Sequence, residues 1–268
     1  MKRGYNGPNN SSECDFFMAT WITHLRLAEN LLALLPGLDP AAFAMGNLGP
    51  DSGVPDAAWE TFDPPSAVTH FWPPSYASQR LDPKAGPSLI RCADLDFYRQ
   101  YLAPLPRPPD DAELFSFRLG YFFHLVTDNL WHSEVGRPTV ERHADRFAAD
   151  KGFIWEVKRD WYALDLAYVQ EHPEHVFWTA FMPSSYDRDY LPFLPGAAVR
   201  HSQAYIKDFY QRSDAAMRKR LEHPPFRYFS APQWEAFLTL ATQRLDEVYH
   251  RLWVDGADAG VGQTALGL

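Results

Sequence analysis

The sequence predicts an all-helical, soluble globular protein, and three observations support this. Apolar residues recur at intervals of three and four along several stretches of the chain. No stretch of alternating apolar and polar residues competes with them as a strand signal. Hydrophobic residues make up 46% and charged residues 22% of the 268 residues, which is typical of a globular protein with a sizeable core. We therefore expect a multi-helix bundle.

The helix signals follow one another along the chain. Thr20 can cap a first helix that stops at Pro36-Gly37, and Asp39-Pro40 opens a short second helix. Further helices are predicted over residues 88–101, 110–135, 138–150, 153–170, 197–211 and 232–253. There is no internal repeat and no clear linker, so we predict one domain over 16–255, between a flexible lead-in at 1–15 and a flexible, glycine-rich tail at 256–268.

Two segments between these helices read as irregular structure. Residues 46–53 are rich in turn formers and contain Asp51, and the proline-rich residues 54–87 contain His70. A long segment without secondary structure is unusual in a compact domain and is often functional. Asp51 and His70 carry ligand-type side chains, although either residue alone is weak evidence of a site.

The charge and the cysteine content restrict the possible partners. A formal net charge of -9 argues against binding to nucleic-acid backbones or to anionic bilayers. Cys14 and Cys92 lie far apart, so neither a disulfide framework nor a thiolate metal site is indicated, and metal ligands must be His and carboxylate. No apolar run is long enough for a signal peptide or a membrane span, so we expect a cytoplasmic protein.

The strongest chemical signal lies in the helix predicted over 110–135. His124, Asp128 and His132 are spaced four residues apart among Phe and Leu residues, which places them on one helix face. An ionised Asp is costly to bury in such surroundings unless it is paired or binds a metal. One ion could contact His124 and Asp128, and a neighbouring ion could reach His132. The alternative is a hydrogen-bonded Asp128 beside an ordinary core histidine, and this stretch alone does not decide between the two.

The order of these residues resembles the zinc-dependent phospholipase C family, which is distantly similar to the fungal S1/P1 nucleases. The resemblance rests on four motifs: Thr23-His24, Gly49-Pro50-Asp51, Thr69-His70-Phe71 and Gly120-x-x-x-His124-x-x-x-Asp128. It implies an all-α bundle of the phospholipase C/P1 nuclease type, with up to three zinc ions at the bottom of a cleft.

The resemblance also implies a set of ligands. Asp51, His70, His124 and Asp128 would hold one ion, and Asp128 would bridge to a second ion that His24 helps to hold. In the family a tryptophan at the mature N-terminus completes the ligands of the second ion, whereas here the nearest tryptophan, Trp21, lies within the chain.

His132 is the candidate ligand for a third ion, although it lies closer to Asp128 than in the family pattern. Phe147 occupies the position where the family has a glutamate. Glu156, Asp160 and Asp165 could substitute, but these charges read more readily as a solvated helix face.

The predicted function is a zinc-dependent, phospholipase C-like phosphoesterase, in which a metal-activated water attacks a small-molecule or lipid phosphate ester. Asp51 would both bind metal and accept the proton of that water, as the resemblance implies.

Two alternatives stay open. The same ligands suit iron or manganese and hence an oxidative or other metal-assisted reaction. A closed site with four protein ligands would instead favour a non-catalytic helical binding module with a structural metal.

Overall fold

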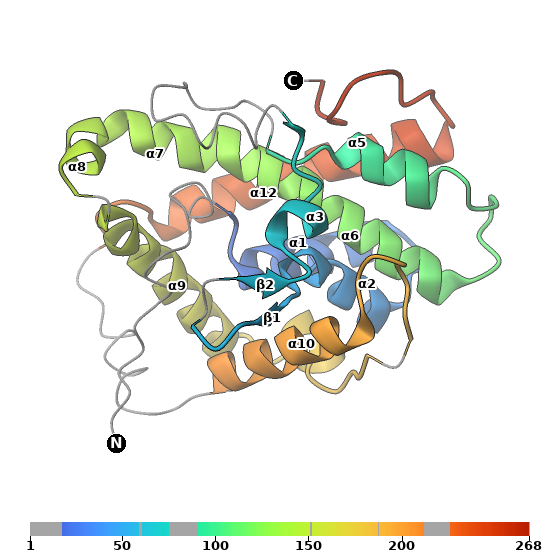
Figure 1. The fold of residues 1–268 in the computed structure, drawn as a ribbon, viewed down its shortest axis with the longest axis horizontal. Coiled ribbons are helices and arrows are strands. Elements are labelled where there is room, and N and C mark those ends of the chain that lie inside the picture. Colours follow the sequence, from blue (N-terminus) through green and yellow to red (C-terminus); the bar gives the residue numbers. More distant parts are fainter. Residues whose placement is uncertain are drawn as a thin grey trace.

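Helices of very different lengths make up most of the fold, and α6 runs through its middle (Figure 1). The computed structural model describes residues 18–58, 61–74, 91–150, 152–186, 188–211 and 226–267. The α-helices are α1 (Trp21–Leu34), α2 (Pro40–Gly46), α3 (Ser66–Thr69), α5 (Asp94–Phe97), α6 (Ala112–Trp131), α7 (Arg137–Arg142), α8 (Ala144–Ala149), α9 (Phe153–Glu171), α10 (Gly196–Gln211) and α12 (Ala231–Tyr249).

The remaining elements are short. The 3-10 helix η2 (Gly49–Asp51) and the π-helical turns η3 (Tyr98–Leu102), η4 (His132–Gly136), η5 (Phe177–Phe181) and η6 (His250–Val254) extend or connect the α-helices. The strands β1 (Val54–Pro55) and β2 (Phe62–Asp63) pair antiparallel. The all-α prediction is confirmed, because this ribbon of two-residue strands is the only sheet in the described part of the chain.

Capping side chains define where the first two helices begin. The Thr20 hydroxyl accepts a hydrogen bond from the Thr23 amide at the start of α1, and the Asp39 carboxylate accepts one from the Ala42 amide at the start of α2. Pro40 takes the first position of α2, where its missing N–H costs nothing. Both starts lie where the sequence predicts them.

The structure differs from the predictions in two helices and in one segment predicted as irregular. The helix predicted over 88–101 begins only at Asp94, and its residues 88–90 lie outside the described part. The helix predicted over 138–150 is interrupted at His143, whose backbone leaves the helical region at φ -121° and ψ 27°. The segment 54–87 contains α3 and the β1–β2 ribbon, while its residues 59, 60 and 75–87 are not described.

Two glycines allow α2 and α6 to cross in close contact. A Cβ atom on Gly120 would lie 2.4 Å from the Phe43 carbonyl oxygen, and one on Gly46 would lie 2.1 Å from the Phe117 carbonyl oxygen. The two backbones therefore touch, which only residues without a side chain permit. This crossing brings Asn47, directly after α2, against the α6 face that carries His124.

The tail is in contact with the rest of the fold. The Ala265 amide donates to the Asp94 carboxylate at 2.7 Å, and Thr264 and Ala265 are buried. The Arg99 guanidinium donates to the carbonyls of Gly260 and Gly262. A glycine-rich composition predicts flexibility, but it does not anticipate contacts that the backbone of the tail makes with α5. Residues 1–15, the predicted lead-in, lie outside the described residues.

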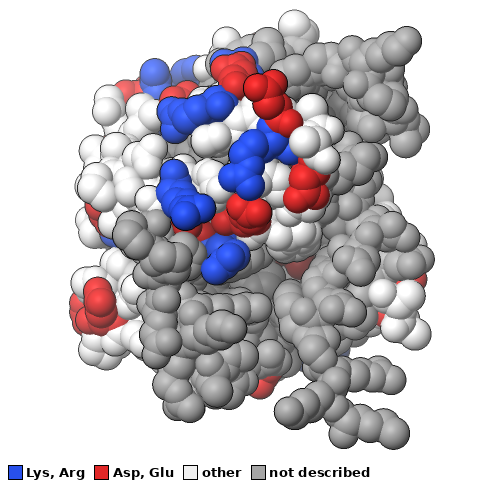
Figure 2. Space-filling view, turned by 90° about the vertical axis from the view of Figure 1, so that its left-hand side faces the viewer, with Lys and Arg blue, Asp and Glu red and all other residues white. Residues whose placement is uncertain are grey.

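Charges of both signs are mixed on the side of the molecule near α8 and α9 (Figure 2). Arg146 of α8 pairs with Glu156 of α9 at 3.1 Å, and Arg137 and Glu141 pair within α7. Lys and Arg side chains form no continuous patch among the coloured residues of this face. None of the described helices combines the length and the hydropathy that a membrane span requires.

Candidate metal centre

Four separate segments bring His and Asp side chains to one buried point. The helix α1 supplies His24, and η2 supplies Asp51 at its end. His70 follows directly after α3, and His124 and Asp128 lie one turn apart on α6. The structure therefore brings together five of the six residues that the sequence predicts as ligands.

The first group surrounds a point between Asp51, His70, His124 and Asp128. The Nε2 atom of His70 lies 3.3 Å from Asp51 Oδ1 and 3.7 Å from Asp128 Oδ2. The Nε2 atom of His124 lies 3.5 Å from Asp128 Oδ2 and 3.9 Å from Asp51 Oδ1. Ligand atoms around a tetrahedral zinc ion lie about 3.3 Å apart, given its bond lengths of about 2.0–2.1 Å. Asp51, His70 and His124 are thus close enough to bind one ion, and Asp128 Oδ2 lies beside both histidines.

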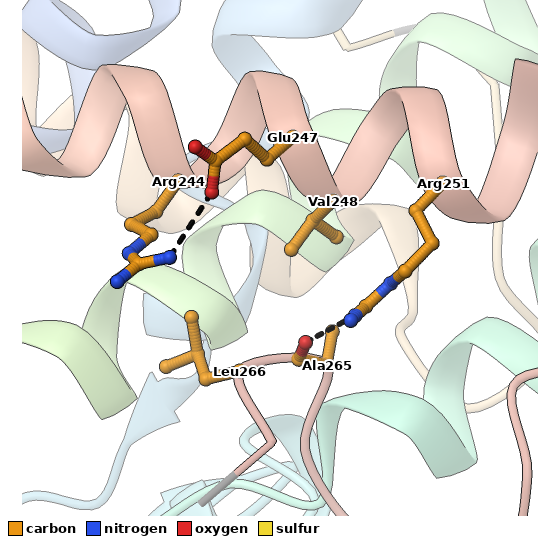
Figure 3. A pocket seen from close by; sticks show the side chains of 6 residues that line it. All are labelled: Arg244, Glu247, Val248, Arg251, Ala265 and Leu266. Atoms are coloured by element: carbon orange, nitrogen blue, oxygen red, sulfur yellow. Dashed lines mark hydrogen bonds and ion pairs between the residues drawn. The ribbon is translucent and has the colours of Figure 1, made fainter.

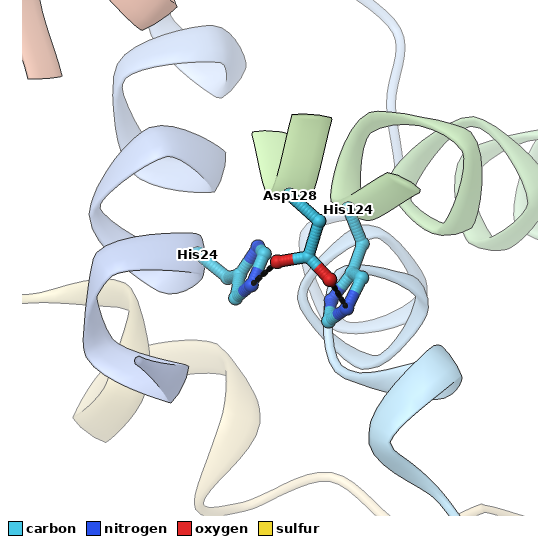
Figure 4. Close-up of side chains that lie close together, drawn as sticks. All are labelled: His24, His124 and Asp128. Carbon is cyan, nitrogen blue, oxygen red and sulfur yellow. Dashed lines mark ion pairs between the residues drawn. The ribbon is translucent and has the colours of Figure 1, made fainter. Parts of the chain in front are cut away.

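The second group joins His24 to His124 and Asp128 (Figure 4). His24 Nε2 lies 3.6 Å from Asp128 Oδ1, so each oxygen of this carboxylate faces a different histidine. The rings of His24 and His124 stack at 3.8 Å with an interplanar angle of 6°. Because the lone pair of one Nε2 serves one ion, His124 cannot complete both groups. A second ion would then have only His24 and Asp128 Oδ1 from this group.

Hydrogen bonds fix the orientation of two of the imidazole rings. The Nδ1 atom of His124 lies 2.7 Å from the Asn47 carbonyl oxygen, and the Nδ1 atom of His70 lies 3.2 Å from the Ser66 carbonyl oxygen. A carbonyl only accepts, so Nδ1 of His124 carries a proton and its Nε2 faces the centre, while Nδ1 of His70 also lies 3.1 Å from the Thr69 hydroxyl. Sequence reasoning missed these backbone partners, because no side chain signals them.

Four of the polar atoms that face the centre make no hydrogen bonds, whereas Asp128 Oδ1 accepts one from the Ala19 amide at 3.3 Å. The Nε2 atoms of His24, His70 and His124 and the Oδ2 atom of Asp128 are all buried and lack a hydrogen-bond partner. Buried polar groups are nearly always satisfied, so this concentration of exceptions needs an explanation. One ion would satisfy the atoms of His70, His124 and Asp128, and a second ion that of His24; a set of nitrogen and carboxylate oxygen ligands without thiolate suits zinc, iron or manganese. The residues present fit a metal ion.

Electrostatics favour ionised carboxylates and a neutral His24, whereas Asp128 and Asp51 raise the pKa of His124 against burial, so that a cation must compete with a proton there. Burial acts to raise the pKa of Asp128, but His124 and His24 outweigh it and hold that pKa well below its usual value. The pKa of Asp51 is lowered in the same way, against burial, by His124 and His70. Burial and the neighbouring His124 lower the pKa of His24. Both carboxylates are therefore ionised and His24 is neutral at neutral pH, as metal ligation requires.

His132 does not join either group of ligands among the described residues. It is the first residue of η4, where the α6 helix gives way to a π-helical turn. Its predicted role as a ligand of a third ion stays a prediction.

The suggestion that Asp160 and Asp165 belong to a solvated helix face is wrong. The Asp160 carboxylate is buried and accepts hydrogen bonds from three successive backbone amides, those of Arg227, Tyr228 and Phe229. Asp165 is fully buried and accepts hydrogen bonds from the Thr20 and Tyr210 hydroxyls, both at 2.7 Å. These two carboxylates hold the fold together and belong to neither ligand group.

The burial of Asp165 makes the stability of the protein depend on pH. Burial raises the pKa of Asp165 from 3.8 to about 7, against the hydrogen bonds from Tyr210 and Thr20. The folded state then binds more protons than the unfolded state, so its contribution is complete below about pH 4 and is lost as the pH rises through about 7. In urea unfolding of metal-free protein, we expect the stability of wild type relative to Asp165→Asn to fall by about 2–3 kcal/mol between about pH 5 and pH 8.

The comparison with Asp165→Asn isolates this single group. Burial also raises the pKa of Asp94 to about 7, but Asp94 is present in both proteins and its effect cancels. The Thr20 and Tyr210 hydroxyls can each turn to accept a hydrogen bond from the new side-chain amide, so the variant is expected to fold. A difference in stability that stays constant from acid to alkaline pH would contradict the prediction.

A surface pocket of about 230 Å³ lies elsewhere, between the end of α12 and the tail (Figure 3). Arg244 and Arg251 line it, but Arg244 pairs with Glu247 at 3.1 Å and Arg251 donates to the Ala265 carbonyl. None of the candidate ligands lines this pocket. It is therefore separate from the metal centre.

The all-helical fold and the buried His and Asp cluster are those of a helical protein with a candidate metal centre. A family model described as zinc dependent phospholipase C matches residues 23–187. The match covers more than half of the chain, so the chain belongs to the zinc-dependent phospholipase C family, which confirms the resemblance seen in the sequence. No curated protein and no solved structure matches the chain. The family and the ligand groups together support a metal-dependent, phospholipase-like hydrolase.

Proposed function

We propose that the protein is a zinc-dependent phosphoesterase that hydrolyses a small-molecule or lipid phosphate ester. One observation carries the proposal: Asp51, His70 and His124 converge beside Asp128 in a chain of the zinc-dependent phospholipase C family, and the Nε2 atoms of both histidines and the Oδ2 atom of Asp128 lack hydrogen-bond partners. When bound, a divalent ion supplies Lewis-acid activation of water and of a phosphoryl oxygen.

Asp51 is the residue best placed to move a proton. Its side chain is 12% exposed, whereas those of His70, His124 and Asp128 are at most 1% exposed. The carboxylate therefore borders both the ligand group and solvent. Its lowered pKa keeps it ionised, so one oxygen can bind metal while the carboxylate accepts a proton from the attacking water.

The other residues around the centre orient the ligands and take no part in proton transfer. The Asn47 and Ser66 carbonyls orient the His124 and His70 rings, and the carboxylate of Asp128 faces His24 and His124 on its two sides. The Ser202 hydroxyl of α10 lies 3.4 Å from the carbonyl oxygen of Asp51 and 3.4 Å from the Gly53 amide. It fixes the loop on which Asp51 sits.

Metal analysis and a substrate panel test the proposal together. Protein purified without chelator or nickel is analysed by inductively coupled plasma mass spectrometry and assayed with a phosphodiester, a phosphomonoester and phospholipid vesicles. Bound zinc with turnover of at least one substrate supports a phosphoesterase, and the substrate that turns over distinguishes a soluble ester from a lipid. Iron or manganese as the bound metal would favour the redox alternative. Bound zinc without any turnover would favour the binding module.

The variant Asp51→Asn tests the proposed proton acceptor. An amide cannot accept the proton, so we expect kcat to fall by about 10²–10⁴-fold. Zinc content and the rate at each pH are measured in parallel, with the exposed Asp145→Asn as the control for loss of one negative charge. An Asp51→Asn protein that keeps full activity and full zinc content would remove Asp51 from the mechanism.

A further inference from the structure

The turn that presents His70 has an unusual backbone. His70 directly follows α3, and the next residue, Phe71, has a φ of 51°. The Trp72 amide donates to the Ala67 carbonyl across this turn, which is the helix-ending motif that normally has glycine at the left-handed position. For a bulky residue this left-handed backbone conformation costs about 1–2 kcal/mol. Strained residues of this kind persist only where their surroundings hold them.

One support of this turn comes from Tyr121 of α6. The buried Tyr121 hydroxyl donates to the carbonyl oxygen of Thr69, the residue just before His70. Burial raises the pKa of Tyr121 well above its usual value, so the hydroxyl stays protonated and remains a donor. Tyr121 lies one turn before His124 on α6. The ligand and the support therefore share one rigid helix.

A second support comes from Asn129, next to Asp128 on the same helix. The Asn129 side-chain oxygen accepts hydrogen bonds from the Arg91 and Cys92 amides at 2.8 and 2.9 Å, and its amide group donates to the Cys92 carbonyl at 2.8 Å. The amide of the following residue, Ala93, donates to the Phe71 carbonyl at 2.8 Å. Asn129 thus anchors the segment that holds the other side of the turn.

The aromatic ring of Phe71 completes the arrangement. It packs edge-on against Phe97 and Phe193, each with ring centroids 5.4 Å away, and against Tyr101 at 6.3 Å. These contacts offset the strain of the left-handed backbone, while the hydrogen bonds on both sides of His70 set its position.

We infer that Tyr121 and Asn129 are positioning residues that hold the strained turn at Phe71 and so place His70 Nε2 against the ligands of α6. The inference rests on the proposed metal centre, but it goes beyond the ligands themselves. The helix α6 itself carries His124 and Asp128. Through Tyr121 and Asn129 it also sets the position of His70.

The test compares two variants that each lose one buried tyrosine hydroxyl. Tyr121→Phe removes the donor to Thr69, and Tyr98→Phe removes a donor to the Leu252 carbonyl, 2.8 Å away in η6, which carries none of the ligands. Loss of a group that orients a ligand typically weakens metal binding by about 10–100-fold. We expect this loss of zinc affinity in Tyr121→Phe and unchanged affinity in Tyr98→Phe, measured by competition with a chelating dye.

Cobalt(II) substitution reports the geometry of the centre independently of activity. Its visible absorption bands should shift in Tyr121→Phe and match wild type in Tyr98→Phe. Asn129→Ala should shift the bands as well, and if that variant does not fold, Tyr121→Phe decides alone. Wild-type zinc affinity and wild-type cobalt bands in Tyr121→Phe would overturn the inference and leave the metal centre intact. A wild-type chain that binds neither metal would overturn the proposed centre and this inference together.

Discussion

Replacement of Asp128 by Asn is expected to abolish metal binding and, with it, hydrolysis. Asp128 faces ligands on both sides, because its two oxygens lie 3.6 and 3.5 Å from the Nε2 atoms of His24 and His124, and its Oδ2 lies 3.7 Å from that of His70. An amide is a poor ligand, and its NH₂ group would face one of the two rings. We expect zinc affinity to fall by more than the roughly 100-fold typical of changes outside the ligands themselves. Metal content and phosphoesterase rate would be measured on the same preparation.

Asp165→Asn is the matched control for this experiment. Asp165 is also fully buried, but its partners are the Thr20 and Tyr210 hydroxyls rather than metal ligands. Zinc lost from Asp128→Asn and retained by Asp165→Asn would show that the effect belongs to the centre and not to any buried aspartate. One full equivalent of zinc in Asp128→Asn would exclude Asp128 as an essential ligand.

Local signals explain why the helical fold could be predicted. Thr20 and Asp39 cap their helices through contacts within three residues, so the sequence contains all the information needed. The break at His143 and the late start of α5 at Asp94 depend instead on what packs around them. The tail contacts depend on Asp94 and Arg99, which lie more than a hundred residues away in the chain.

In the candidate site, too, the contacts within one helix were predictable from local sequence, and the contacts between distant segments were not. The spacing of His124 and Asp128 on one helix predicts their proximity from local geometry. Their approach to Asp51, His70 and His24 followed only from the order of the motifs, because three loops and helices must fold onto α6 to create it. The same spacing argument placed His132 with them, but α6 ends at Trp131 and His132 begins a π-helical turn.

The sequence alone did not reveal which polar side chains are buried. Asp160 and Asp165 look like surface charges on an amphipathic helix, yet each is at most 1% exposed. What distinguishes them is the set of donors that other segments bring to them. Tyr121 and Asn129 were missed for the same reason, since each acts on a segment that is distant in sequence.

Gly120→Ala is expected to destabilise the protein, although the same change stabilises most helices. Alanine is favoured over glycine within a helix by about 1 kcal/mol. At Gly120, however, the new Cβ would lie 2.4 Å from the Phe43 carbonyl oxygen and 2.9 Å from the Asn47 amide nitrogen. Both are backbone atoms, so α2 itself must move, and overpacking of this kind typically costs about 1–3 kcal/mol or more. Urea unfolding of metal-free protein would measure the change.

The same substitution should weaken zinc binding, because Asn47, which orients the His124 ring, directly follows α2. Displacement of α2 moves the Asn47 carbonyl, which lies 2.7 Å from His124 Nδ1 and orients that ring. The control is Gly262→Ala, where the nearest atom to a new Cβ is 3.7 Å away and neither stability nor zinc affinity should change. A Gly120→Ala protein that is more stable than wild type would show that the α2–α6 crossing tolerates a methyl group. The close helix contact would then not be what fixes His124, and the glycine of the Gly120-to-Asp128 motif would need another explanation.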